Sequence, residues 1–314
     1  MADFTLLPVT DLDAFAQALA AWRPDRAASA ETLRQRDCER RPGEYGGRLW
    51  AMRGGEPAEL HTLDFPRTEN QPGWLNLLVG SREPALLPAL LRAGLEEAQV
   101  AGASTVITRV QEDRPELAAY QAAGFCEYDR MFGSTLDLTA FQPSMFAARE
   151  RRAGQAGLRV RSLAEELAGR EFGGAEARRL YALIASRLAD VPGQAALQPW
   201  PFEVWMARVG QKIDSRGLLL AVTPQGEWVG LTELFLELEP GVLHTGLTGV
   251  EPQWQGRGVA LALKVAALRA AQQRGAHTAH TSNHAGNAPM LAVNRALGFV
   301  PEPATVMLRC ELAG

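Results

Sequence analysis

Two long segments of the chain carry apolar residues at helical spacing, with shorter apolar stretches on either side. The segments 84–100 and 259–274 are rich in alanine and leucine, and each is followed by a glycine suited to end a helix. Strand-like stretches lie before each helix, at 74–79 and 243–250, and after it, at 104–110 and 277–282. A strand, a helix and a second strand in this order predict an α/β unit, here present twice.

The two units are similar in sequence. Gly102 to Thr108 matches Gly275 to Thr281 at an offset of 173 residues, sharing Gly, Ala and both threonines. Further along, 120–125 matches 294–299 at an offset of 174, and both stretches end in Gly-Phe. Two matched blocks in the same order at nearly the same offset indicate a duplicated domain.

Chain length agrees with a duplication, because 314 residues at about 150 per domain suggest two domains. Charge and glycine without apolar periodicity mark a join near 150–157. We therefore expect an N-terminal domain of residues 1–145, a linker of residues 146–157 and a C-terminal domain of residues 158–314. Within the last, 191–205 is expected to be a loop whose aromatic rings form either a hydrophobic plug or the wall of a substrate site.

Composition excludes several classes of protein. Hydrophobic residues make up 46%, charged residues 22%, and the net charge is -4, so a globular fold is expected and a nucleic-acid partner is not. Cys38, Cys126 and Cys310 are far apart and form no CxxC pair, which argues against a disulfide framework and a zinc site. Without a signal-peptide pattern at Met1–Phe4 or a run of about 18 apolar residues, we expect a cytoplasmic protein with no membrane partner.

The stretch 250–260 points to a phosphate site. Gly256 and Gly258 lie between a predicted strand and the start of a predicted helix. The first backbone N–H groups of a helix have no intrahelical acceptor, and glycine lets a phosphate approach them closely. The stretch lacks the three spaced glycines of a dinucleotide fold and the Gly-Lys-Ser/Thr ending of a P-loop. A pyrophosphate site is therefore predicted, with a plain strand-to-helix turn as the alternative.

This stretch resembles the acetyl-coenzyme A signature of the GNAT acetyltransferase superfamily. The residues that carry the resemblance are Val250, Pro252, Trp254, Gln255, Gly256, Arg257, Gly258 and Ala260, followed by Asn283, Asn287, Met290, Asn294, Leu297, Gly298 and Phe299. It covers about residues 243–300. Because tandem members of the superfamily carry two such domains, the repeat extends it along the chain. The resemblance implies an α/β fold of two tandem acyl-CoA N-acyltransferase domains, each with a mixed, mostly antiparallel sheet flanked by helices.

The cofactor site is expected in the second copy alone. In the first copy the position of the phosphate loop, 79–85, lacks the paired glycines, so that domain is expected to be degenerate. In the second, the resemblance implies that the pantetheine arm of acetyl-CoA lies along the predicted strand and the pyrophosphate at the turn. The implied cofactor-binding residues are Thr248, Gly249, Val250, Gln255, Gly256, Arg257, Gly258, Val259, Ala260, Leu261, Asn283, Asn287 and Asn294.

The resemblance also implies direct attack of an amine on the thioester, which needs a base and a partner for the leaving thiolate. Glu233, on the predicted strand 228–235, is the first candidate for the base and His244 is the second. Asn294 stands where the family usually has the tyrosine that meets the thiolate, whereas the first copy keeps Tyr120. Either Asn294 only orients the cofactor, or another residue or a water protonates the thiolate.

The expected protein is thus an N-acetyltransferase that uses acetyl-CoA and no metal. His277 and His280 are three apart in a predicted strand and so point to opposite faces, which argues against a shared metal ion. The acceptor is expected to be a small-molecule amine, with a peptide amine as the alternative, and the protein to be a monomer or a homodimer. The competing function is a non-catalytic or sensing coenzyme A-binding protein, which Asn294 in place of tyrosine favours.

Overall fold

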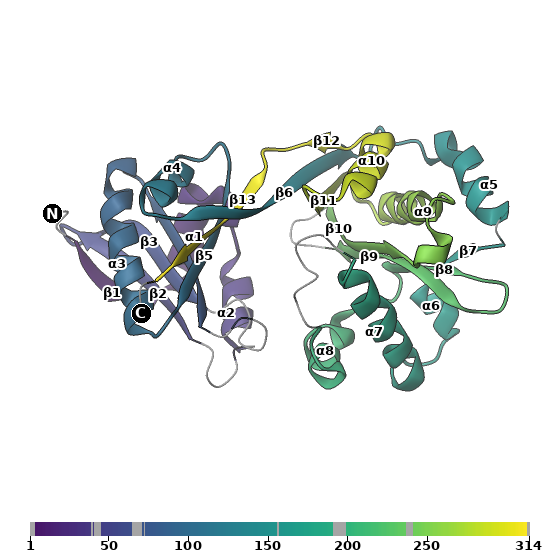
Figure 1. Ribbon diagram of the computed structural model, residues 1–314, viewed down its shortest axis with the longest axis horizontal. Helices are drawn as coiled ribbons and strands as arrows, with labels where there is room; N and C mark the ends of the chain where they lie inside the picture. The colour runs from purple at the N-terminus through teal and green to yellow at the C-terminus, as the bar shows by residue number, and fades with distance from the viewer. Residues whose placement is uncertain are drawn as a thin grey trace. The chain divides into compact units, whose positions relative to one another are not determined.

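The computed structural model describes residues 4–38, 40, 45–64, 71, 73–155, 157–190, 199–236 and 241–312 (Figure 1). The chain divides into two compact units, one of Met1–Met131 with Pro303–Gly314 and the other of Phe132–Glu302. The segment after residue 302 therefore belongs with the first part of the chain. The domain boundaries 1–145 and 158–314 refer to the two copies of the sequence repeat, and they remain a prediction.

Unit 1 contains a mixed sheet in which antiparallel pairs predominate. Its elements are β1 (Thr5–Pro8), α1 (Leu12–Trp22), η1 (Pro24–Arg26), α2 (Ala30–Cys38), β2 (Gly46–Arg53), β3 (Glu56–Asp64), β4 (Trp74–Ser81), η2 (Pro84–Leu86), α3 (Leu87–Val100), β5 (Thr105–Gln111), α4 (Pro115–Ala122), the first half of β6 (Cys126–Asp137) and β13 (Thr305–Glu311). The strand order is β1-β2-β3-β4-β5-β13-β6, and among the strand pairs that the structure describes in this unit only β4 and β5 are parallel.

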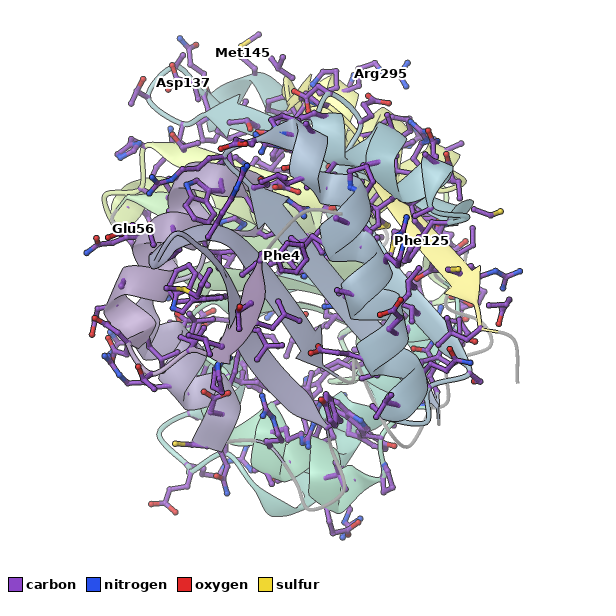
Figure 2. The ribbon with its side chains drawn as sticks, turned by 90° about the vertical axis from the view of Figure 1, so that its left-hand side faces the viewer. Phe4, Glu56, Phe125, Asp137, Met145 and Arg295 are labelled. Atoms are coloured by element: carbon purple, nitrogen blue, oxygen red, sulfur yellow. The ribbon has the colours of Figure 1, made fainter. Side chains whose placement is uncertain are left out.

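Helices cover both faces of the unit 1 sheet. On one face, α3 and α4 contribute Leu90, Leu91 and Tyr120 to a buried cluster with alternate residues of β4, β5 and β13. Phe4, labelled in the end-on view of Figure 2, packs against the same cluster. On the other face, α1 and α2 pack with Leu78 of β4 in a separate cluster. The sheet is therefore buried between two apolar layers.

Unit 2 repeats this architecture. Its elements are the second half of β6, η3 (Pro143–Phe146), α5 (Ala147–Gln155), β7 (Arg159–Ser162), α6 (Leu163–Leu167), α7 (Gly174–Leu188), α8 (Phe202–Arg208), η4 (Gly210–Lys212), β8 (Leu218–Val222), β9 (Trp228–Leu236), β10 (Val242–Val250), η5 (Pro252–Trp254), α9 (Val259–Gln273), β11 (Thr278–His284), α10 (Ala288–Leu297) and β12 (Val300–Pro301). The strand order is β6-β11-β10-β9-β8-β7, with β12 on β6, and β10 and β11 run parallel.

The two faces of the unit 2 sheet have separate cores. Helices α9 and α10 pack on one face with Leu234, Leu243 and Val250, and α6, α7 and α8 pack on the other with Leu231 and Leu247 (Figure 1). Because successive strand residues point to opposite faces, a residue's place in β9 or β10 decides which core it joins. The same alternation assigns each candidate side chain of the site to one face of the sheet or the other.

The sequence predicted the repeated strands and long helices, and the structure confirms them as β4, α3, β5, β10, α9 and β11. Two predictions of irregular structure are wrong. Helix α5 lies in the segment expected to be a linker, where Arg269 of α9 forms an ion pair with Glu150 at 2.9 Å. Helix α8 occupies the end of the loop expected at 191–205, while 191–198 lie outside the described residues.

Candidate active site

The parallel strands β10 and β11 separate partway along their length. Their described pairing runs from Val242 opposite Thr278 to Thr245 opposite Thr281. Both strands continue beyond this last pair, β10 to Val250 and β11 to His284. We call the opening between 246–250 and 282–284 the second fork. Its edges carry backbone polar groups that an extended ligand could pair with, as a third strand would.

A β-bulge lies in β10 at the start of the second fork. Thr245 and Thr248 face Leu234 and Thr232 of β9, so β10 has one residue more than β9 over this stretch. The backbone N–H of Leu247, within the bulge, donates a hydrogen bond of 3.1 Å to Oε2 of Glu233. Burial raises the pKa of Glu233 to about 7, although the Leu247 bond lowers it. The bulge thus brings a carboxyl group that titrates near neutral pH to the fork.

The turn after β10 is built around two left-handed glycines. Gly256 and Gly258 have φ angles of 71° and 81°, which favour glycine over any residue with a Cβ. Gly258 is the N-cap of α9 and supplies no side-chain cap, and the first turn carries no acidic residue. The N–H groups of Val259, Ala260 and Leu261 therefore begin a helix whose positive end is not neutralised by its own side chains.

The carbonyl at the end of β10 is held from two directions. Val250 O accepts a hydrogen bond of 3.0 Å from Nε2 of Gln255 and one of 3.2 Å from Nη1 of Arg187 in α7. Arg187 passes so close to Gly249 that a Cβ there would lie 2.6 Å from its Cγ. The position of the glycine turn relative to the fork is fixed by these contacts. Arg257 is exposed, and its guanidinium carbon lies 5.2 Å from the ring centre of Trp254.

Three asparagines lie at the fork or after it: Asn283 in β11, Asn287 at the N-cap of α10, and Asn294 within α10. Nδ2 of Asn294 donates to Oδ1 of Asn283, whereas Oδ1 of Asn294 is buried and has no hydrogen-bond partner within the described residues. A buried carbonyl oxygen without a partner costs free energy unless a ligand or water satisfies it. Asn287 caps α10, because its Oδ1 accepts the N–H of Met290 at 3.2 Å. Its assignment to the cofactor stays a prediction.

Lys264 is a buried residue of the site that the sequence interpretation missed. It projects from α9, is only 1% exposed, and its Nζ lies 3.3 Å from the hydroxyls of Thr245 and Thr281, the last pair before the fork. Burial lowers the pKa of its ammonium to about 7. A signal was present: Lys264 falls on the apolar stripe of a helix whose neighbouring stripe positions, Leu261 and Leu268, are buried.

Two histidines of the site, His244 and His280, form a stacked pair. His244 and His280 lie opposite each other in β10 and β11, with ring centres 5.2 Å apart, and Nδ1 of His280 is 3.3 Å from Oε1 of Glu302. Strand alternation places His244 on the same sheet face as Glu233 and opposite Thr245. The described part of the chain holds no cluster of three His, Cys, Asp or Glu residues that could bind a metal.

Unit 1 has the corresponding opening between β4 and β5, which we call the first fork, but side chains fill it. The described pairing of β4 and β5 ends at Asn76 opposite Ile107. Beyond it, the hydroxyl of Tyr120 accepts the N–H of Val79 at 3.1 Å and donates to Leu77 O at 3.2 Å. This first fork is therefore already hydrogen-bonded from within the unit.

Arg23 crosses the first fork from the opposite face. Its Nη1 donates to Val79 O of β4 at 2.6 Å, its Nη2 donates to Arg109 O of β5 at 3.2 Å, and Asp25 neutralises it at 2.8 Å. At the start of the following helix, Pro84 and Pro88 have no N–H group to offer a phosphate. That the first copy is degenerate stays a prediction, and these contacts are consistent with it.

The part of the chain that contains the second fork matches a known protein family. Residues 184–299 match the model of the acetyltransferase (GNAT) family. A mycothiol acetyltransferase of Arthrobacter sp. (strain FB24) is 35% identical over 102 residues, and a mycothiol acetyltransferase of Paenarthrobacter aurescens (strain TC1) is 34% identical over 98 residues. Each alignment covers 30% of this chain and 30% of the relative.

Solved structures share the fold over nearly the whole chain. A GCN5-related N-acetyltransferase from Sphaerobacter thermophilus is 21% identical, with a TM-score of 0.70 over 98% of this chain and 95% of that chain. A tandem GNAT protein from the clavulanic acid biosynthesis pathway is 19% identical, with a TM-score of 0.71 over 99% of both chains. No helix in the described ranges is long and apolar enough to cross a membrane.

Proposed function

Because this chain belongs to the GNAT superfamily and has its tandem fold, we propose that unit 2 transfers an acetyl group from acetyl-CoA to a primary amine. The observation that carries the proposal is the bulge at the second fork, where Glu233 meets the N–H of Leu247 beside two separated strands. A base next to an opening for an extended ligand suits amine attack on a thioester.

Three features of unit 2 support acetyl-CoA as the acyl donor. The free edges of β10 and β11 could pair with the amides of a pantetheine arm, and the start of α9 at Gly258 could hold a pyrophosphate. The buried Oδ1 of Asn294 lacks a hydrogen-bond partner within the described residues, and a pantetheine N–H could supply one. In this arrangement Thr248, Gly249 and Val250 border the arm, and Gln255 to Leu261 surround the pyrophosphate.

Glu233 would take the proton from the attacking amine. Its pKa of about 7 leaves a useful fraction ionised at neutral pH, and the Leu247 bond fixes one carboxylate oxygen. It lies on the sheet face covered by α7 and α8, so the acceptor would approach from that side. His244 lies on the same face and stays the second candidate for the base, stacked on His280.

The acceptor would be a small-molecule amine that meets aromatic surface. Tyr181, Phe202 and Trp205 form a ring cluster on the α7 and α8 side, with centres 5.4 to 6.0 Å apart. Arg178 lies 4.2 Å from the ring centre of Phe202. The aromatic segment is expected to form either a hydrophobic plug or the wall of a substrate site. Buried Trp205 suits a plug, whereas partly buried Phe202 could border the acceptor.

The test is release of free thiol from acetyl-CoA with a panel of primary amines. An amino sugar, a polyamine and a lysine peptide represent the acceptor classes, and Glu233→Gln serves as the variant without a base. Amine-dependent thiol release by the wild type but not by Glu233→Gln supports the proposal. If the protein binds acetyl-CoA yet releases no thiol with any amine, the alternative is favoured: a non-catalytic coenzyme A-binding protein, consistent with Asn294 at the tyrosine position.

A further inference from the structure

The two copies can be compared residue by residue at their forks. Trp74 pairs with Thr105 in unit 1 as Val242 pairs with Thr278 in unit 2, and Thr105 and Thr278 are equivalent in the sequence repeat. Counting along the strands from these pairs places Thr245 of β10 at the position of Leu77 in β4. The hydroxyl of Tyr120 donates to Leu77 O, so it marks the base of the first fork.

Two helix positions differ between the copies in a complementary way. At the offset of 174 that relates the Gly-Phe blocks, Tyr120 becomes Asn294. At the offset of 173 that relates the helix-ending glycines, Leu91 becomes Lys264. Unit 1 therefore has a hydroxyl from α4 and an apolar side chain from α3, whereas unit 2 has an amide from α10 and an ammonium from α9.

Lys264 reaches the same place as the Tyr120 hydroxyl. Its Nζ contacts Thr245, the counterpart of Leu77, and Thr281 across the last strand pair. Tyr120 and Leu91 share one cluster under α3, and Lys264 lies in the corresponding layer between α9 and the sheet. The proton on Nζ thus lies at the closed end of the opening into which an extended thioester would fit.

Resting on the proposed function, we propose that the ammonium of Lys264 gives its proton to the coenzyme A sulfur as the thioester breaks. A bond forms between the amine nitrogen and the acyl carbon, and the carbon–sulfur bond breaks with its electron pair going to sulfur. Glu233 takes a proton from the nitrogen, and Lys264 supplies one to the sulfur. Exchange with water then restores both groups, so atoms and charge balance over one turnover.

Base and acid would act from opposite faces of the sheet. Glu233 lies on the α7 and α8 face and Lys264 on the α9 face, with the fork between them. An amine entering from one face and a thiolate protonated from the other would avoid direct exchange of the proton between the two groups. Asn294 does not ionise and so cannot give a proton to the sulfur. Lys264, on the neighbouring helix α9, would supply that proton.

The surroundings of Lys264 favour an ammonium that gives up its proton readily. Its neighbours among the described residues carry no counter-charge: the hydroxyls of Thr245 and Thr281 are neutral, and the ring of Phe299, centred 5.3 Å from Nζ, offers only a weak cation–π contact. The charged or titratable groups of the elements packed around it are directed elsewhere. Glu233, His244 and His280 lie on the other sheet face, Arg269 and Arg274 of α9 pair with Glu150 and Asp214, and Arg295 of α10 is exposed.

The experiment measures the ionisation of the coenzyme A thiol bound to the full chain. Ultraviolet absorbance of the thiolate is followed against pH, with S-methyl coenzyme A as the blank, and affinity is measured by calorimetry. A cation beside a thiol lowers its pKa from the usual value of about 8.5. We expect the bound thiol to titrate at least one pH unit lower in the wild type than in Lys264→Met, with affinities within about threefold. Leu91→Met, at the matching position of unit 1, should titrate as the wild type does.

A second variant separates charge from proton donation. Lys264→Arg keeps a cation that does not release its proton at ordinary pH. It should retain the low thiol pKa but lose turnover about 100-fold, the lower end of what a proton donor contributes. Identical thiol titrations in the wild type and Lys264→Met, with both binding coenzyme A, would overturn the proposal. Failure of the wild type to bind coenzyme A would overturn the proposed function itself.

Discussion

The carboxyl group of Glu233 and the backbone N–H of Leu247 are joined by a hydrogen bond of 3.1 Å across the bulge in β10. This contact couples an irregularity of the backbone to a group that titrates near neutral pH. A regular strand would place the residue at position 247 on the α9 face, whereas the extra residue puts Leu247 in the α7 and α8 core with Glu233 beside it.

Glu233→Gln should slow the reaction and change its pH dependence. Wild-type kcat/KM should rise with pH below about 7 as the carboxyl group ionises, because only the carboxylate accepts a proton, and should fall above it as Lys264 loses the proton that it would give to sulfur. The variant should lose about 100-fold or more and show no such rise. Glu227→Gln, on the exposed turn before β9, is the control and should behave as the wild type. An acidic limb below pH 7 that persists in Glu233→Gln would remove Glu233 as the base.

The same substitution should increase stability at alkaline pH. The folded state raises the pKa of Glu233 from 4.5 to about 7, so between these values it binds a proton that the unfolded chain has released. The wild type therefore loses stability as pH rises from 4.5 to 7, by at most about 3 to 4 kcal/mol at about 1.4 kcal/mol per pH unit. From pH 5 to pH 8, the midpoint temperature of thermal unfolding should fall further for the wild type than for Glu233→Gln. Equal falls would contradict burial of the ionised form.

Gly258→Ala should weaken acetyl-CoA binding beyond its effect on folding. Gly258 and Gly275 have φ angles of 81° and 84° at opposite ends of α9, so alanine should cost about 1 kcal/mol at either position. Only the methyl group at 258 would stand where the backbone meets a phosphate. Calorimetry should find at least tenfold weaker binding for Gly258→Ala and unchanged binding for Gly275→Ala. Equal affinities of the two variants would exclude the turn as a phosphate site.

Tyr120→Phe should destabilise unit 1 without changing the amount of acetyl-CoA bound. Loss of the hydroxyl leaves the buried N–H of Val79 and carbonyl of Leu77 without this partner, at a cost of about 1 to 3 kcal/mol. Tyr128→Phe, in a half-buried ring that packs on Trp74, is the control for removing a hydroxyl. The expected stoichiometry is one acetyl-CoA per chain in all three proteins. A stoichiometry of two would show that the first fork accepts the ligand.

Lys264→Met should stabilise the protein while impairing the reaction. Burial lowers the pKa of Lys264 from 10.5 to about 7, so between these values the unfolded chain holds a proton that the folded chain lacks. Wild-type stability therefore falls as pH drops from 10.5 to 7, and methionine removes this dependence. We expect a gain of about 1 to 3 kcal/mol at pH 6, the usual cost of a poorly compensated buried polar group, and a smaller gain at pH 9. Thermal unfolding of the wild type and Lys264→Met at pH 6 and pH 9 would measure this gain in stability.

Periodicity and the repeat predicted the elements of the fold because they are local signals. The apolar stripe of α9 and the glycine that follows it are written in adjacent residues, and so is the turn at Gly256 and Gly258. Helix α5 was missed because its surface is charged and its burial rests on Ala153, packed beside α9. Its stabilising ion pair joins residues 119 positions apart, which no local pattern reveals.

The site was predictable in its residue types and less so in its contacts. Glu233 could be placed on a strand, but its bond to Leu247 depends on a bulge whose extra residue leaves no mark in the alternation of apolar residues. Lys264 could be placed on a helix, yet its role depends on two threonines from different strands that meet only in the folded sheet. The side chains that fill the first fork come from opposite faces of the sheet: Arg23 directly follows α1, and Tyr120 lies in α4.

The place of β13 governs the order in which the protein can assemble during synthesis. Strand β13 lies between β5 and β6, so the sheet of unit 1 has a gap between these two strands until residues 305–311 have emerged from the ribosome. Unit 2 contains only residues 132–302 and can close earlier. The half of the chain that is translated first would therefore be the last to complete its sheet, and loss of its final strand would expose two unpaired strand edges to aggregation.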